Sequence, residues 1–268
     1  MYTPWMFRSP GAIAFHLGPL TIRWYGVLMA TAILVGFWLA DRAAKREGVS
    51  ADKLLNAAQW AIIAGLLGAR IYEVVFNWDY YGQHPWKIPA VWEGGLAIHG
   101  GLIAGVLTGL WVARREGLPI RRSLDIVAPS IAIGQAIGRW GNFFNEEAFG
   151  TPTDLPWKLY ISPPNRPLQY AGNEYFHPTF LYESLWDALV FVALVGARRR
   201  LADRPSAVFY LYIGLYSVGR FLIESIRVDS FWVGSFRVPQ LASLVGIALA
   251  LGGLFFVFVR AGGNKVAA

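Results

Sequence analysis

The chain has 268 residues, of which 55% are hydrophobic and only 15% are charged, and its mean hydropathy is +0.40. A soluble domain of this length could not keep so much apolar surface away from water, so the composition indicates an integral membrane protein. The net charge of +7 does not indicate a nucleic-acid partner, because no basic tract is interleaved with stacking aromatic residues. The sequence contains no cysteine, which excludes disulfides, thiolate metal sites and a thiol nucleophile of the protein's own. We predict no metal site.

Seven apolar runs have the length of a membrane-spanning helix, which is about 20 residues. The N-terminus lacks the basic start, compact apolar run and small-residue cleavage site of a signal peptide, so no removable leader is expected. No internal repeat or flexible linker divides the chain. The sequence therefore predicts an all-α polytopic protein that forms a single membrane domain, 1–268. The seven predicted spans lie near 20–40, 55–76, 96–113, 124–140, 179–197, 207–226 and 239–259.

Basic residues gather in alternate connections between these runs. They follow the first, third and fifth runs, and the C-terminal tail adds Arg260 and Lys265. Basic loops face the cytoplasm, so we expect the C-terminus inside and the N-terminus outside. The largest segment on the outer face is then the loop 142–177.

Ionisable side chains inside membrane spans are costly and usually face a bundle interior or a cavity, so each is a candidate site residue. Arg70 and Glu73 stand three residues apart on one helix face, where an ion pair between helices and a catalytic use are both open. His99 precedes glycines that recur every four residues from Gly101 to Gly109, a pattern that lets membrane helices pack closely. Packing explains the glycines. His99 is either an interhelical hydrogen-bond partner or a titratable group for chemistry near neutral pH.

The segment 137–150, "IGRWGNFFNEEAFG", places Arg139, Asn142, Asn145 and Glu147 at the outer end of the fourth run. An arginine at such an end is commonly a side chain that reaches the interface. Here it stands beside glycines and amides, on the face where arginine should be rare, which favours the holding of a polar ligand. The two asparagines could donate hydrogen bonds to an oxyanion or cap the helix end.

A stripe of charge crosses the sixth run, where "GRFLIESIR" places Arg220, Glu224 and Arg227 on one helix face. A structural salt-bridge ladder is one interpretation. The other is an anion site, because two arginines for one carboxylate leave a guanidinium free to hold phosphate in a bidentate way. Before the fifth run, "HPTFLYE" places His177, Tyr182 and Glu183 at an ordinary proline-containing helix start.

Five fragments, "GPLTIRWYG", "IHGGLIAG", "GRWGNFFNEEAFG", "HPTFLYE" and "GRFLIESIR", stand in this order between Gly18 and Gln240. Together they resemble the prolipoprotein diacylglyceryl transferase family. The resemblance implies transfer of a diacylglyceryl group from phosphatidylglycerol to the lipobox cysteine of a prolipoprotein, forming a thioether and releasing glycerol phosphate. It also implies that no cofactor is needed, that the partners are phosphatidylglycerol, the lipobox segment and the lipid bilayer, and that the protein lies in the bacterial cytoplasmic (inner) membrane. The reaction would be the first step of lipoprotein maturation.

The same resemblance assigns site residues. The expected catalytic residues are His99, Arg139, Arg220, Tyr25, Asn142 and Glu224. The expected phosphatidylglycerol-binding residues are Arg139, Arg220, Arg227, Asn142, Glu147, Gly100 and Gly150, with His177, Tyr182 and Tyr216 in support. The family commonly has glycine where this chain has Glu146, and that departure leaves the local turn to be explained.

The implied chemistry gives these residues roles. Only a thiolate attacks well, so the substrate cysteine needs a base, for which His99 is the candidate. Arg139 and Arg220 would neutralise the leaving phosphate, and Glu224 and Glu147 would orient guanidinium groups. Two other functions remain open on the residues alone: an anion transporter, which the missing repeat disfavours, and a non-catalytic scaffold that binds anionic lipid.

Overall fold

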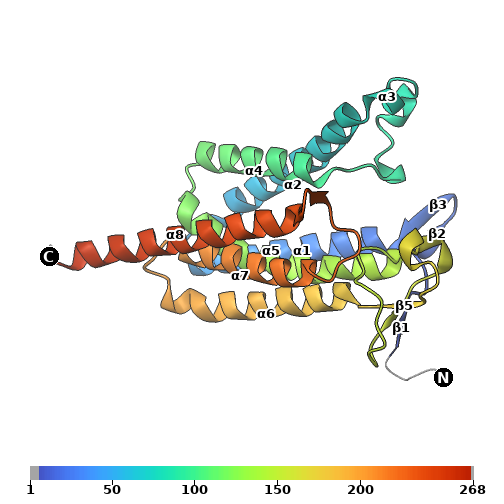
Figure 1. Ribbon diagram of the computed structural model, residues 1–268. Coiled ribbons are helices and arrows are strands. Elements are labelled where there is room, and N and C mark those ends of the chain that lie inside the picture. The colour runs from blue at the N-terminus through green and yellow to red at the C-terminus, as the bar shows by residue number, and fades with distance from the viewer. Residues whose placement is uncertain (1–5, 267–268) are drawn as a thin grey trace. The chain divides into compact units, whose positions relative to one another are not determined.

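The computed structural model describes residues 6–266 and is mainly helical (Figure 1). Residues 1–5, at the end where no removable leader is expected, and the side chains of Arg260 and Lys265 lie outside the described part. Each of the seven apolar runs contains a long helix. The helices are α1 (Trp24–Arg46), α2 (Ala51–Phe76), α4 (Ile98–Arg115), α5 (Ile120–Asn145), α6 (Thr179–Arg200), α7 (Ala207–Glu224) and α8 (Val238–Val266).

By length and composition, five helices of the described chain could cross a membrane. They are α1, α2, α6, α7 and α8. The expectation of a mainly helical, polytopic membrane protein is therefore confirmed at this level.

Short strands are the main departure from the all-α prediction. The first helix begins at Trp24, four residues after the predicted start, because the preceding residues form a hairpin of β2 (Ile13–Leu17) and β3 (Leu20–Arg23). Gly18 turns this hairpin with a φ of 58°, which glycine adopts without steric cost. A second hairpin joins β6 (Trp232–Val233) to β7 (Phe236–Arg237).

The predicted outer loop 142–177 also contains regular structure. Its strand β4 (Leu159–Tyr160) pairs in parallel with β1 (Phe7–Arg8) and antiparallel with β5 (Tyr175–Phe176). Six buried apolar side chains hold this small sheet against the end of α5 and the start of α6; they are Phe143, Phe149, Leu159, Ile161, Phe176 and Phe180. The remaining short helices are α3 (Trp78–Tyr81), η1 (Pro85–Lys87), η2 (Val91–Glu93), η3 (Pro163–Asn165) and η4 (Leu168–Tyr170).

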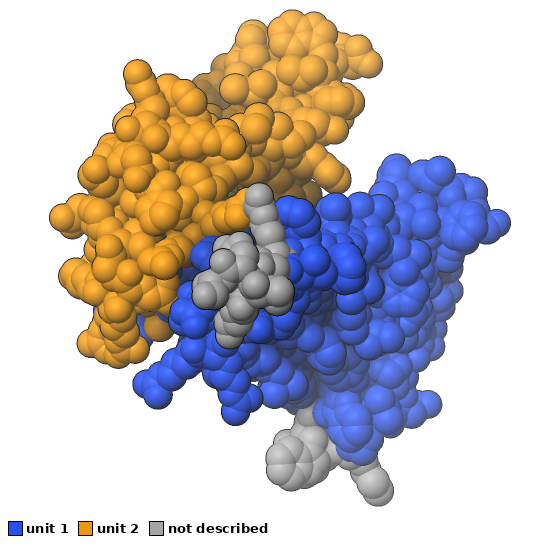
Figure 2. Space-filling view, turned by 90° about the vertical axis from the view of Figure 1, so that its left-hand side faces the viewer, with its two compact units in different colours: residues 1–38, 124–268 blue, residues 39–123 orange. Residues whose placement is uncertain are grey.

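The chain divides into two compact units, 39–123 and 1–38 with 124–268 (Figure 2). In the unit 39–123, α2 packs on α4 through small residues. A Cβ atom added at Gly100 would lie 2.3 Å from the carbonyl oxygen of Gly68, and one added at Gly105 would lie 3.0 Å from that of Ala61. These contacts confirm close helix packing along the glycine repeat.

In the other unit, α5, α6, α7 and α8 run lengthwise beside one another (Figure 1). The core shared by α5, α6 and α7 consists of Ala128, Ala132, Val190, Leu194 and Val208. Small alanines on α5 let α6 and α7 approach closely, and this packing places the polar faces of the three helices against one another.

Candidate active site

Three arginines converge on one carboxylate in the unit 1–38 with 124–268. Arg139 comes from α5, Arg220 from α7 and Arg227 from the segment just after α7. Their Nη1 atoms lie 3.0, 2.6 and 3.3 Å from the carboxylate oxygens of Glu183, which comes from α6. We call these four residues the arginine cluster. Its centre, Glu183, is only 4% exposed.

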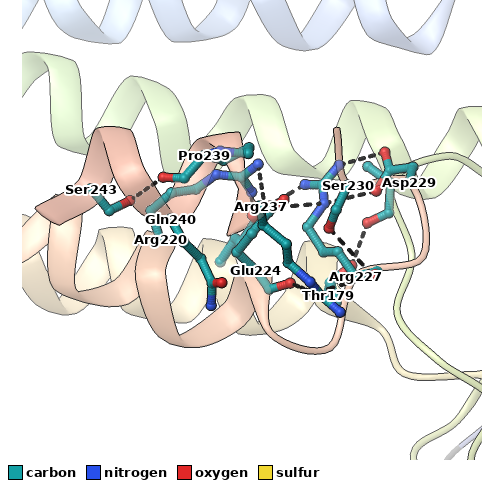
Figure 3. Close-up of polar contacts among 12 residues, drawn as sticks. Thr179, Arg220, Glu224, Arg227, Asp229, Ser230, Arg237, Pro239, Gln240 and Ser243 are labelled. Carbon is teal, nitrogen blue, oxygen red and sulfur yellow. Dashed lines mark hydrogen bonds and ion pairs between the residues drawn. The ribbon is translucent and has the colours of Figure 1, made fainter. Parts of the chain in front are cut away.

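Further carboxylates surround the cluster. Glu224 lies 2.7 Å from Arg220 Nη2, and Asp187 lies 4.0 Å from Arg139 Nε. Asp229 accepts hydrogen bonds from both Nε and Nη2 of Arg227 at 2.9 and 2.7 Å (Figure 3).

The sequence-based expectation of a guanidinium left free by the stripe is therefore wrong. That expectation counted only the carboxylate of Glu224, whereas Glu183, Asp187 and Asp229 come from outside the stripe.

The neighbouring carboxylates offset the effect of burial on Arg227. Burial by itself would lower the pKa of Arg227, but Asp229, Glu183 and Glu224 outweigh it and hold that pKa above its usual value. Buried carboxylates such as Glu183 and Glu224 are tolerated only when cations and hydrogen bonds compensate the lost hydration. The three guanidinium groups of the cluster are thus paired with Glu183 inside it and with Glu224, Asp187 and Asp229 around it.

A small cavity opens beside the cluster. Its volume is about 10 Å³, roughly the space for one water molecule. Gly219 leaves space for the Trp186 side chain that lines this cavity, because a Cβ at position 219 would lie 2.1 Å from the indole nitrogen of Trp186. The cavity brings Tyr216 to the arginines, and its lining consists of Arg139, Glu183, Trp186, Asp187, Tyr216, Gly219, Arg220 and Ile223.

The polar segment that follows α5 is folded tightly. Asn142 donates a hydrogen bond of 2.9 Å from its amide to Glu147, so Glu147 orients this amide and not a guanidinium. Glu146 has a φ of 52°, in the left-handed region that favours glycine. Its carboxylate accepts hydrogen bonds from the backbone and hydroxyl of Ser162 and, at 3.0 Å, from Asn165. These bonds explain how this chain holds a turn for which the family commonly has glycine.

Gly150 joins this segment to the cluster. Its N–H donates to the carbonyl of His177 at 3.0 Å, and it forms a β-bridge with Arg227. A Cβ at Gly150 would lie 2.7 Å from the Cβ of His177, so only glycine fits without displacement. The expected residue Gly150 therefore has a visible role in bringing two backbone segments together.

His177 and Tyr182 lie side by side at the start of α6. Nδ1 of His177 is 3.2 Å from the hydroxyl of Tyr182, which also accepts a hydrogen bond of 3.0 Å from Trp157. Burial lowers the pKa of His177 below its usual value. Burial thus favours the neutral form of this histidine, which lies beside Tyr182 at the start of α6.

Tyr25 stands at the second position of α1, and its ring covers Gly141 on α5. A Cβ at Gly141 would lie 2.5 Å from that ring. The neighbouring Trp24 stacks on Phe144 with ring centres 4.7 Å apart. Tyr25 is 41% exposed, next to the helical turn that carries Asn142.

His99 and Gly100 belong to the unit 39–123. His99 is exposed at the second position of α4, with its ring centre 6.1 Å from that of Tyr72. Gly100 is buried against α2.

Arg70 and Glu73, for which an ion pair and a catalytic use were both open, lie on α2 and form no ion pair with each other among the described residues. Arg70 instead donates to backbone carbonyls of Ile88, Gly94 and Gly95 at 2.7 to 2.8 Å. It thereby ties α2 to the segment that leads into α4.

Sequence reasoning singled out Glu183 only as part of "HPTFLYE" and gave it no role, and it missed Asp187. Both are carboxylates four residues apart inside an apolar run, so the rule that intramembrane charges mark sites applied to them as well. It also missed Arg237, whose guanidinium contacts the carbonyls of Glu224 and Arg227 (Figure 3).

Comparison with known proteins places this sequence in a family. Residues 12–256 match the family described as "Prolipoprotein diacylglyceryl transferase". A "Phosphatidylglycerol--prolipoprotein diacylglyceryl transferase" of Trichormus variabilis is 50% identical over 260 residues, which cover 95% of this chain and 92% of the relative. Proteins of the same name from Synechococcus elongatus and Synechocystis are 47% and 41% identical, cover 94% of this chain, and are themselves covered to 89% and 91%. Since the match extends over nearly the whole chain, this protein belongs to the prolipoprotein diacylglyceryl transferase family.

Proposed function

We propose that this chain transfers the diacylglyceryl group of phosphatidylglycerol to the cysteine sulfur of a prolipoprotein. The observation that carries the proposal is the convergence of Arg139, Arg220 and Arg227 on Glu183 among apolar helices, in a chain whose relatives bear the name of this reaction. Buried guanidinium groups suit a phosphate headgroup held at membrane depth.

The reaction displaces phosphate at a glycerol carbon. The substrate sulfur forms a C–S bond with that carbon, the C–O bond to phosphate breaks, glycerol phosphate leaves, and the thiol proton passes to a base. The nucleophile is the substrate's own, which fits a protein without cysteine.

The arginine cluster would stabilise the leaving phosphate. Arg139 and Arg220 line the cavity, and their side chains are 20% and 19% exposed. Their contacts to Glu183 Oε2 and Glu224 Oε2 are ion pairs without hydrogen-bond geometry, so the N–H bonds involved are not aimed at those oxygens. The carboxylates thus fix the forks while donors remain for the developing charge.

The other expected residues take supporting positions. Asn142, oriented by Glu147, offers an amide near Tyr25, and Tyr216 lines the cavity. His99 is proposed as the base, because its exposed imidazole is the type of group that titrates near neutral pH. Gly100 is proposed to serve binding indirectly, by letting α4 pack against α2.

The proposal includes the membrane topology. The seven long helices would form one membrane domain, with the N-terminus and the segment 142–177 outside and the C-terminus inside the bacterial inner membrane. The basic residues after α1, α4 and α6 support this orientation.

Purified protein in vesicles containing phosphatidylglycerol, given a lipobox peptide, tests the function. The expected product is a thioether-linked diacylglyceryl peptide with release of glycerol phosphate. Ion flux without that product would support a transporter, and lipid binding without turnover would support a scaffold.

Two variants then test the residues in the same assay. Arg220→Lys should lower the rate about 100-fold although the charge is kept, because the bidentate fork is lost. Arg115→Lys is the matched control, since Arg115 stacks on Trp111 at the end of α4.

His99→Gln should slow the reaction strongly at neutral pH. The rate of this variant should recover partly as the pH rises and free thiolate of the peptide accumulates. No recovery would remove the support for His99 as the base.

A further inference from the structure

The hairpin β6–β7, between α7 and α8, presents an unusually apolar surface. Phe231, Trp232, Val233 and Phe236 are between 53% and 71% exposed. The hairpin ends at Arg237, and α8 begins at the next residue as a candidate membrane span. The apolar surface is therefore continuous with a lipid-facing helix.

Arg237 connects this hairpin to the arginine cluster. Its Nη1 donates to the carbonyl of Glu224 and lies 3.4 Å from the carbonyl of Arg227 (Figure 3). The centre of its guanidinium lies 4.9 Å from the centre of the Trp232 ring. Carbonyls at a helix C-terminus lack intrahelical partners and attract cations, so this contact is favourable as well as close.

We propose that the β6–β7 hairpin is a lipid-contact surface at the membrane interface, and that Arg237 is a positioning residue coupling it to the arginine cluster. Lipid is the occupant because the residues suit the boundary between acyl chains and headgroups. The hairpin has a tryptophan and neighbouring apolar side chains, and the guanidinium of its arginine stays among polar carbonyls. Any shift of the hairpin moves the carbonyls of Glu224 and Arg227, and with them the guanidinium that contacts Glu183. The lipid contact does not depend on the proposed function, whereas the coupling to the arginine cluster rests on it.

Depth measurements test the lipid contact without reference to activity. Because the chain has no cysteine, a nitroxide label attaches only at an introduced one. In vesicles, a label at Val233→Cys should be relaxed more by oxygen than by a water-soluble nickel complex. A label at Asp154→Cys, where the side chain is fully exposed, should show the reverse and serves as the control. Equal accessibility of both labels to the nickel complex would overturn the lipid contact.

Rates test the coupling. Arg237→Leu should lower kcat about tenfold with little change in the KM for the peptide, because a misplaced guanidinium affects the reacting geometry more than peptide binding. Arg8→Leu is the matched control, since Arg8 also stacks on a strand tyrosine, 4.8 Å from the ring of Tyr160, but outside the cluster. Arg237→Lys should have a kcat between those of Arg237→Leu and the wild type. The double variant with Trp232→Leu and Arg237→Leu should have nearly the same kcat as Arg237→Leu alone.

Several outcomes would overturn the coupling. Normal kcat in Arg237→Leu is one, and full additivity with Trp232→Leu is another. If Arg237→Leu does not fold, Arg237→Lys and Trp232→Leu must each lower kcat, and normal values in both count against the proposal. A wild-type protein inactive on phosphatidylglycerol and peptide would remove the proposed function, whereas the label depths would still decide the lipid contact.

Discussion

At the scale of single residues, Glu183 holds the site together. One carboxylate, 4% exposed, receives contacts from three guanidinium groups on different segments of the chain. Removing its charge would leave Arg139 with only Asp187, at 4.0 Å, and would take a shared partner from Arg220 and Arg227. Breaking a buried ion pair by removing one partner is costly because the remaining charge is uncompensated.

Glu183→Gln should therefore reduce both stability and activity. We expect a loss of about 3 to 5 kcal/mol in the free energy of unfolding, and little transfer activity in the folded fraction. Thermal unfolding in detergent and the peptide assay measure the two effects. Asp154→Asn is the control, because its contact with Lys158 is 3.9 Å long and exposed. A Glu183→Gln protein as stable as that control would contradict the central role of this carboxylate.

His177 gives a pH dependence whose sign follows from its burial. Burial lowers its pKa in the folded protein, so the unfolded chain, with a pKa of about 6.5, binds the proton first as the pH falls. The stabilising contribution is complete above about pH 6.5 and is lost as the pH falls through the folded pKa. Unfolding temperatures measured from pH 8 to pH 5 should fall, and His177→Gln should flatten the curve. The exposed His16→Gln is the matched control, and a variant with the wild-type slope would exclude His177 as the cause.

At the scale of elements, the contact of α2 with α4 depends on glycines, which have no side chain to separate the two helices. A methyl group at Gly100 would meet both the carbonyl of Gly68 and the Cβ of Tyr72 at 2.3 Å. Gly100→Ala should therefore separate the helices and destabilise the protein by about 1 to 3 kcal/mol, the usual cost of overpacking. Gly252→Ala in α8 is the control, because nothing lies within 4 Å of the added methyl group.

Thermal unfolding and lipid binding together identify the role of Gly100. A stable Gly100→Ala variant that fails only in phosphatidylglycerol binding would assign the glycine to the lipid site and not to helix packing.

Periodicity and hydropathy predicted the helices well, because a membrane span repeats one signal over about 20 residues. The short strands escaped prediction, since pairs such as β4 and β5 depend on partners far along the chain and on the buried aromatic cluster around Phe176. The grouping of Arg220, Glu224 and Arg227 could be read from local spacing, but the expectation that all three share one helix was wrong, because α7 ends at Glu224. The neutralising partner Glu183 could not be matched to these residues, because only tertiary packing brings α6 beside α7.

At the scale of the whole molecule, the sequence predicts seven membrane crossings, and the described part of the structure offers five helices that meet the criteria for a span. Residues 6–266 contain seven long helices, but α4 and α5 are not among the five that meet the length and hydropathy expected of a span. α5 carries Pro129 and polar residues such as Arg139 and Asn142, which lower its hydropathy. Seven spans require the turn between α4 and α5 to face the cytoplasm, whereas five would leave it on the same side as the segments before α4 and after α5.

Single cysteines in this cysteine-free chain decide between these topologies. In intact spheroplasts, a membrane-impermeant maleimide should label Gln83→Cys, before α4, and Asp154→Cys, after α5. It should reach Pro119→Cys, between those helices, and Asp203→Cys, between α6 and α7, only after the membrane is broken. Pro119 and Asp203 are exposed in the fold, so the membrane alone would protect them. Labelling of both Pro119→Cys and Asp154→Cys in intact spheroplasts would exclude seven spans. Labelling of only Pro119→Cys and Asp203→Cys in intact spheroplasts would instead invert the proposed orientation, in which the arginine cluster lies near the outer face.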